Sequence, residues 1–98
     1  MGGNTFTNIL VAPDAKLAFR ALVEDAKHQC GHGGYSGTIA EKDSFVMIDT
    51  VETEGDALAL SDRLIDNQDS RIDDKWGPAG CIEIKSEKAF LFFGWASS

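Results

Sequence analysis

Hydrophobic and polar positions along the first third of the chain predict a strand followed by a helix. Residues 5–11 are rich in β-branched and aromatic side chains, which favours a strand. Pro13 and Asp14 then suit a helix start, because proline needs no N–H in the first turn and aspartate lies near the positive end of the helix dipole. Apolar residues recur at helical spacing until Gly31, a typical helix C-cap. The expected buried stripe comprises Ala15, Phe19, Leu22 and Ala26, flanked by Ala18, Val23 and Cys30.

The segment that follows predicts a hairpin. Residues 38–40 and Phe45–Val51 are expected to pair around a turn at Lys42 and Asp43. The second of these strands begins with the run Phe-Val-Met-Ile, so both of its faces are expected to be buried. We therefore predict that this strand lies in the centre of the sheet.

A second helix and a second hairpin are predicted in the rest of the chain. Thr53, with Asp56 three residues later, resembles a capping box at a helix start. A polar stretch follows the helix at residues 66–79, and residues 81–85 and 89–95 predict two strands joined by a turn at residues 86–88. The buried stripe of the second helix is expected to comprise Ala57, Leu60 and Leu64, with Leu58 and Ile65 beside them.

The predicted order β-α-β-β-α-β-β over residues 1–98 indicates a single α+β domain. Right-handed crossovers over a mainly antiparallel sheet give a ferredoxin-like two-layer sandwich with both helices on one face. The connection after the first helix and the polar stretch at residues 66–79 then fall at opposite ends of the sheet. Because a domain of this size has a marginal core and would leave one apolar sheet face uncovered, we expect a homodimer.

The charge of the chain limits its partners. There are 16 acidic and 9 basic residues, which give a net charge of −7 at pH 7. Direct nucleic-acid binding needs clustered Lys and Arg, so this composition argues against it. The acidity fits a binder of basic protein surfaces, a domain with a small positive pocket in an acidic shell, or a protein that its charge merely keeps soluble.

Cellular context is predicted from what the sequence lacks. No long apolar run indicates a membrane span, and the first residues have neither the basic nor the apolar part of a secretory signal. We therefore expect a cytoplasmic protein with no membrane partner. Cys30 and Cys81 lie in different predicted elements and no oxidising compartment is indicated, so both are expected to be reduced core residues.

The most distinctive segment is the glycine-rich stretch at residues 31–38. Its glycines allow positive φ and let a ligand approach main-chain N–H groups closely, so we predict that it holds a small anionic or nucleotide-like ligand. The stretch matches neither the dinucleotide fingerprint nor the P-loop, because both follow a strand and open a helix. A helix cap with a tight connection is the alternative. The predicted contact residues are His32, Gly33, Gly34, Tyr35, Ser36 and Thr38.

A second contact region is predicted at Lys75 and Trp76. A tryptophan beside Gly-Pro in a polar stretch is typical of a stacking platform or an interface anchor. The alternative is that Trp76 closes the end of the core and has no contact with a ligand.

Metal and catalytic chemistry find little support in the sequence. His28, Cys30 and His32 alternate, but alternate residues on a helix do not face each other, and no second ligand pair occurs at zinc-like spacing. The aspartates of residues 66–74 lack the regular ligand spacing of a calcium loop. We expect no metal and no cofactor. A small hydrolase or lyase that uses His32 and Tyr35 is the catalytic alternative.

Two stretches, GHGGYSGTIAEK at residues 31–42 and KWGPAG at residues 75–80, resemble a group of small uncharacterised proteins from bacteria and their phages. The group has no established activity, but the resemblance implies a context. Small acidic phage proteins without catalytic motifs frequently inhibit host defence, by sequestering a nucleotide signal or by occupying a protein surface. The leading expectation is therefore a non-enzymatic anti-defence binding protein, in the host cytoplasm if phage-encoded. An acidic inhibitor that docks on a basic partner surface is the alternative.

Overall fold

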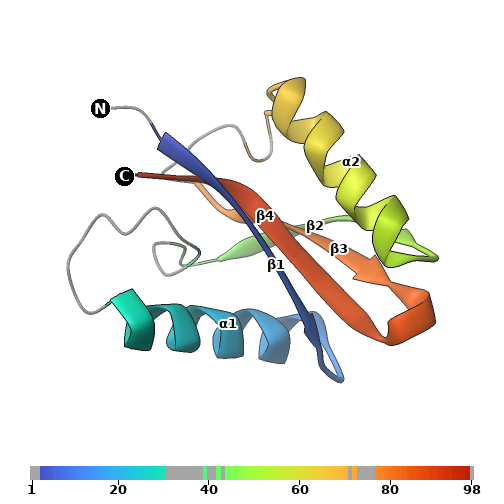
Figure 1. Ribbon diagram of the computed structural model, residues 1–98, viewed down its shortest axis with the longest axis horizontal. Helices are drawn as coiled ribbons and strands as arrows, with labels where there is room; N and C mark the ends of the chain where they lie inside the picture. The colour runs from blue at the N-terminus through green and yellow to red at the C-terminus, as the bar shows by residue number, and fades with distance from the viewer. Residues whose placement is uncertain are drawn as a thin grey trace.

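A four-stranded mixed sheet lies between two helices in the computed structural model (Figure 1). The structure describes residues 3–30, 39, 42, 44–70, 72 and 77–97, and of residues 3, 4, 29, 30, 96 and 97 it describes the backbone alone. A 3-10 turn at Lys85–Glu87, η2, joins the last two strands. Within the described residues the main elements are β1 (Gly3–Val11), α1 (Ala15–Cys30), β2 (Phe45–Val51), α2 (Glu54–Asp66), β3 (Ala79–Ile84) and β4 (Ala89–Ser97).

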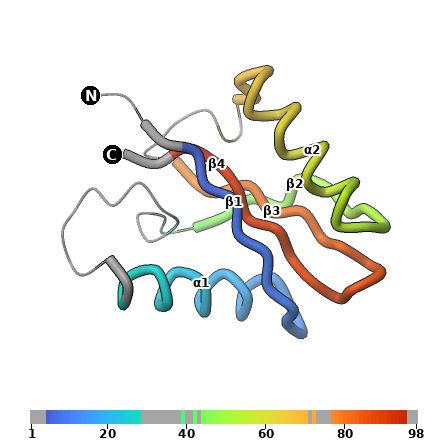
Figure 2. Tube along the Cα trace, in the orientation of Figure 1, coloured from blue at the N-terminus to red at the C-terminus, as the bar shows by residue number. Residues whose placement is uncertain are grey.

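The sheet has the strand order β1-β4-β3-β2. β4 pairs antiparallel with both β1 and β3, whereas β2 runs parallel to β3. β1 and β4 keep one continuous register, but the β2–β3 pair contains a bulge between Met47 and Asp49. The last strand of the chain is therefore a central strand, as the tube in Figure 2 shows.

Alternating side chains of the central strands build two cores, one under each helix. On one face Phe92 lies in a cluster with Ala18 of α1, and on the other Phe93 lies in a cluster with Ala57 of α2. All four side chains are completely buried. A strand whose successive residues point to opposite faces can contribute to both cores only if both faces are covered. The two helices accordingly lie on opposite faces of the sheet (Figure 1).

Local sequence signals place the two helices and the second hairpin where they were predicted. Asp14 Oδ1 accepts a hydrogen bond from the Leu17 N–H at 2.8 Å, and Thr53 Oγ1 accepts one from the Asp56 N–H at 3.2 Å. Each of these bonds satisfies a backbone donor that the first turn of a helix leaves unpaired. β3 and β4 form the predicted hairpin, in which Lys88 adopts a left-handed conformation with φ 50°.

The predicted two-layer sandwich with both helices on one face is wrong, although the α+β class is correct. The connection through α1 crosses the sheet from β1 to the far edge at β2, and the connection through α2 returns from β2 to β3. Right-handed crossovers that run in opposite directions across a sheet place their helices on opposite faces. The result is a helix-sheet-helix arrangement in place of a ferredoxin-like fold.

Two predictions about strands are also wrong. Of residues 38–40 the structure describes Ile39, which lies in a 3-10 turn. The Ile39 carbonyl accepts a hydrogen bond from the Lys42 N–H at 2.9 Å. Ile39 is thus not part of a strand, and among the described residues β2 pairs with β3 alone, as an edge strand. Its residues are apolar on both faces because Phe45 packs in the α1 core and Ile48 in the α2 core.

The buried stripe of α2 is narrower than predicted. Ala57 is buried, and Leu60, Leu64 and Ile65 are half-buried, but Leu58 is 37% exposed and lies outside the core. Neither helix in the described part of the chain is long and apolar enough to cross a bilayer.

Candidate functional site

The two connections that carry the sequence-predicted contact residues begin and end at the same end of the sheet. Phe45, at the start of β2, lies opposite Ala79, at the start of β3. The Ala79 N–H donates to the Ser44 carbonyl at 3.0 Å, and Lys42 Nζ donates to the Gly77 carbonyl at 3.0 Å. The prediction that these connections fall at opposite ends is wrong, because β2 and β3 run parallel and so begin at the same end of the sheet.

The predicted contact residues themselves lie outside the described residues. This applies to the whole glycine-rich stretch and to the second contact region. The residues concerned are His32, Gly33, Gly34, Tyr35, Ser36, Thr38, Lys75 and Trp76. Their described flanks, at Lys42 and Gly77, are in contact.

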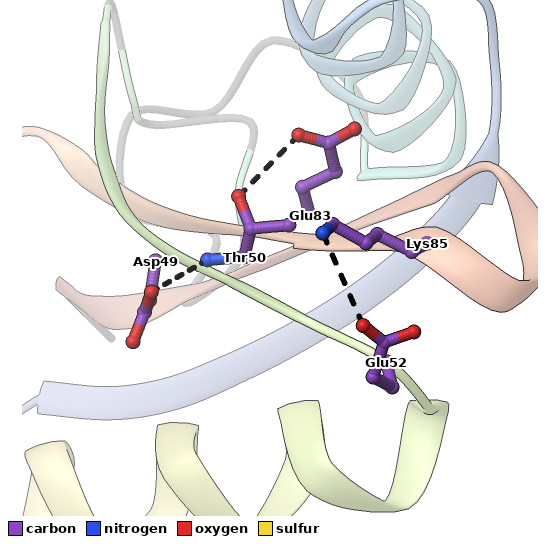
Figure 3. Close-up of polar contacts among 5 residues, drawn as sticks. All are labelled: Asp49, Thr50, Glu52, Glu83 and Lys85. Carbon is purple, nitrogen blue, oxygen red and sulfur yellow. Dashed lines mark hydrogen bonds and ion pairs between the residues drawn. The ribbon is translucent and has the colours of Figure 1, made fainter.

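The opposite end of the sheet is closed by short turns that bond to one another. The Ala12 N–H donates to the Lys88 carbonyl at 3.3 Å, and the Ser86 N–H donates to the Glu52 carbonyl at 3.0 Å. Figure 3 shows the polar side chains at this end, where Lys85 Nζ lies 3.9 Å from Glu52 Oε1. The turns at this end are thus tied to one another by backbone hydrogen bonds and an exposed ion pair.

A hollow of about 530 Å³ lies between α1 and the start of β2. Phe19 and Val23 of α1 and Phe45 of β2 form its apolar floor. The rings of Phe19 and Phe45 have centroids 5.1 Å apart and are tilted by 46°, and both side chains are half-buried. The volume falls in the range of about 300–1,000 Å³ that is typical of small-molecule sites.

Basic side chains surround this floor. Lys16, Arg20 and Lys27 line the hollow from α1 and are exposed to solvent. Their spacing of four and seven residues places them on one face of the helix. Glu24 is an acidic residue on the same lining. Guanidinium and ammonium groups in this arrangement can donate charge-assisted hydrogen bonds to phosphate or carboxylate oxygens.

Lys42 closes the hollow toward β3. Its side chain is only 3% exposed, and its Nζ lies 6.0 Å from the centroid of the Phe6 ring while it donates to the Gly77 carbonyl. A buried ammonium group is stable when hydrogen-bonding partners replace water. Lys42 therefore joins the flanks of the two connections and adds a positive charge behind the hollow.

The hollow has the opposite charge sign to the chain as a whole. Among the described residues that line it, four are basic (Lys16, Arg20, Lys27 and Lys42) and one, Glu24, is acidic. This matches one of the three interpretations of the net charge, a small positive pocket in an acidic shell. Sequence reasoning followed the apolar stripe of α1 and missed the basic stripe beside it, although the spacing of Lys16, Arg20 and Lys27 was the available signal.

Comparisons with models of known protein families, with curated proteins and with solved structures find no match to this chain. The functional conclusion therefore depends on the chemistry of the site.

Nucleophilic and metal chemistry are not supported by the described residues. Cys81 is completely buried, and its burial, with a smaller effect of Glu83, raises the pKa of its thiol to about 12. A thiol with such a pKa is protonated at neutral pH and is a poor nucleophile. His28 is exposed, and no group of three His, Cys, Asp or Glu side chains in the described ranges is arranged to hold a metal ion.

Proposed function

We propose that the protein binds a small anionic ligand of the nucleotide type in the hollow between α1 and β2, without catalysing a reaction. The observation that carries this proposal is the gathering of Lys16, Arg20, Lys27 and Lys42 around an aromatic floor in a chain of net charge −7.

The two parts of the hollow suit the two parts of a nucleotide. The Phe19 and Phe45 rings offer an apolar surface for a base, and aromatic stacking of a base is worth about 1–3 kcal/mol. Lys16, Arg20 and Lys27 can reach phosphate oxygens at the rim, where the side chains are solvated and adaptable. A charge-assisted hydrogen bond contributes about 1.5–3 kcal/mol.

The glycine-rich stretch belongs to the same proposal. Residues 31–38 lie in the connection between α1 and β2, the two elements that line the hollow. We therefore assign His32, Tyr35 and Ser36 as further ligand contacts, with Lys75 and Trp76 as a second contact region. On the basis of the resemblance to phage proteins, the biological role we propose is the sequestration of a nucleotide signal in an infected cell.

Isothermal titration calorimetry with ATP, AMP and inorganic phosphate tests the proposal. Arg20→Ala should weaken nucleotide binding roughly tenfold or more, since it removes a charge-assisted hydrogen bond. Arg63→Ala is the matched control, because Arg63 is also an exposed helical arginine but lies on α2, across the sheet. Phe45→Leu should weaken binding of AMP and leave binding of inorganic phosphate unchanged, since only the nucleotide has a base to stack.

Three results would contradict this function. One is an unmodified protein that binds none of the three probes, and another is equal loss of affinity in Arg20→Ala and Arg63→Ala. The third is a nucleotide affinity that falls steeply with added salt, as the affinity between two charged protein surfaces does. That result would favour the alternative of an acidic inhibitor on a basic partner surface.

A further inference from the structure

The two edges of the sheet differ in how far they are protected against pairing with another strand. On the β2 edge a bulge interrupts the strand between Met47 and Asp49, and Asp49 Oδ1 accepts a hydrogen bond from the Thr50 N–H at 2.8 Å. A bulge and a charged side chain on the edge strand are devices by which natural proteins prevent edge-to-edge association. β2 is therefore a protected edge.

The β1 edge has none of these devices. β1 is 9 residues long and keeps an uninterrupted register with β4, from Gly3 opposite Ser97 to Val11 opposite Ala89. The chain has no Asp, Glu, Lys or Arg before Asp14. A long, regular and uncharged edge strand is a template for pairing with a further strand.

The hydrogen-bond pattern shows which groups of β1 are available. The Ala12 N–H donates to the Lys88 carbonyl, so even-numbered residues direct their N–H and C=O groups toward β4. The odd-numbered residues, among them Thr5, Thr7 and Ile9, direct theirs outward. Within the described ranges β1 pairs with β4 alone, and Thr5 and Thr7 are exposed.

We propose that β1 pairs with β1 of a second copy of this chain, antiparallel and about a two-fold axis at Thr7. This register places Thr7 opposite its own copy and Thr5 opposite Ile9 of the partner subunit, and it uses the whole length of the strand. All of these residues have outward-directed backbone groups, so each pair can exchange two hydrogen bonds. The two sheets then form one continuous sheet of eight strands.

Charge identifies the partner as a second copy. Two molecules of net charge −7 repel each other, and a contact between them is favoured where both surfaces are neutral. In a two-fold dimer the same surface of each copy meets its counterpart, so that surface must not repel itself. The uncharged β1 edge fulfils this condition. A basic peptide, in contrast, would be attracted to the β2 edge, where Asp49 and Glu52 are exposed.

Sedimentation of matched edge variants tests the proposal. The unmodified chain should sediment as a dimer at about 200 μM, a concentration well above the roughly 10 μM dissociation constant expected for a small interface. Thr7→Lys should raise that constant at least about tenfold, because it places two ammonium groups side by side. Met47→Lys adds the same charge at the β2 edge, where Met47 is 46% exposed, and should leave the dimer intact.

Cysteine cross-linking tests the register independently of these variants. In a Cys30→Ser background, Thr7→Cys should form a disulfide-linked dimer, because the two Cα atoms would lie ~5.5 Å apart, within the range of disulfides. Val11→Cys is exposed on the same strand but would lie ~27 Å from its copy, at ~3.4 Å per residue, and should not cross-link. Three results would overturn the proposal. One is an unmodified chain that stays monomeric at every concentration, and another is an equal dissociation constant for the two lysine variants. The third is equal cross-linking of the two cysteine variants.

Discussion

Among the glycines that the structure describes with their surroundings, Gly80 in β3 has the least space for a side chain. A Cβ atom at this position would be 2.6 Å from Cε1 of Phe93 and 2.9 Å from Cγ2 of Ile72. Phe93 and Ile72 are both buried in the core under α2, so neither side chain can withdraw without disturbing its neighbours. The requirement for glycine is thus one of space for the Phe93 ring.

Gly80→Ala should lower the free energy of unfolding by about 1–3 kcal/mol, the usual cost of overpacking a core. Urea denaturation measures the change. Gly55→Ala is the control, since the nearest atom to a Cβ there is 3.9 Å away and alanine favours a helix by up to ~1 kcal/mol. Equal unfolding midpoints for the two variants would show that Phe93 does not pack against Gly80 in solution.

Cys81 gives the stability a predictable dependence on pH. The thiol pKa is 9.0 without perturbation and about 12 in the folded protein. Below pH 9 the thiol is protonated in both the folded and the unfolded state, so the stabilisation that follows from its raised pKa is fully present. Between pH 9 and 12 the unfolded chain releases a proton that the folded protein keeps, and the free energy of unfolding falls by up to ~1.4 kcal/mol per pH unit.

Urea denaturation at several pH values above 9 would measure this slope against that of Cys81→Ala, which has no thiol to titrate. Other groups titrate equally in both proteins, so the difference between the two slopes isolates Cys81. Identical slopes would mean that the thiol is not shielded from solvent in the folded state.

At the scale of secondary structure, the start of α2 depends on Thr53. Its Oγ1 accepts a hydrogen bond from the Asp56 N–H at 3.2 Å, and the residue itself is extended and exposed. Thr53→Ala should therefore cost about 1 kcal/mol of stability, whereas Thr53→Ser keeps the acceptor and should cost little. Thermal unfolding of the two variants provides the comparison. Serine and alanine variants with the same melting temperature would contradict a capping role.

The elements that were predictable from the sequence are those with local signals. The caps at Asp14 and Thr53 and the turn at residues 86–88 act over a few residues, and the structure has both helices and the second hairpin in those places. Ile39 has no such signal. One buried isoleucine fits a strand or a turn equally well. Its assignment to a strand gave β2 the wrong predicted partner and placed both helices on the same face of the predicted sheet.

The candidate site was predictable only in part, for a related reason. The basic stripe of α1 can be read from the spacing of Lys16, Arg20 and Lys27. The hollow, however, also needs Phe45 and Lys42, which α1 meets only through the fold. Periodicity describes one element at a time, so a site between two elements emerges only once their packing is known.

At the scale of the whole molecule, the two proposals involve opposite edges of the sheet. The hollow is bounded by β2, and the proposed contact between copies is made by β1. A two-fold axis perpendicular to the paired strands keeps both α1 helices on the same face of the eight-stranded sheet. Dimerisation through β1 therefore leaves both hollows accessible, and each proposal can fail without the other.

The position of β4 also determines when the molecule can fold during its synthesis. β4 is synthesised after β1, β2 and β3, yet it lies between β1 and β3 and is the strand through which β1 joins the sheet. The nascent chain consequently carries an uncharged, unpaired β1 until β4 has been translated. Exposed strands of this kind promote misassembly between neighbouring nascent chains. The interval between the synthesis of β1 and that of β4 is therefore the period in which this chain is most exposed to such misassembly.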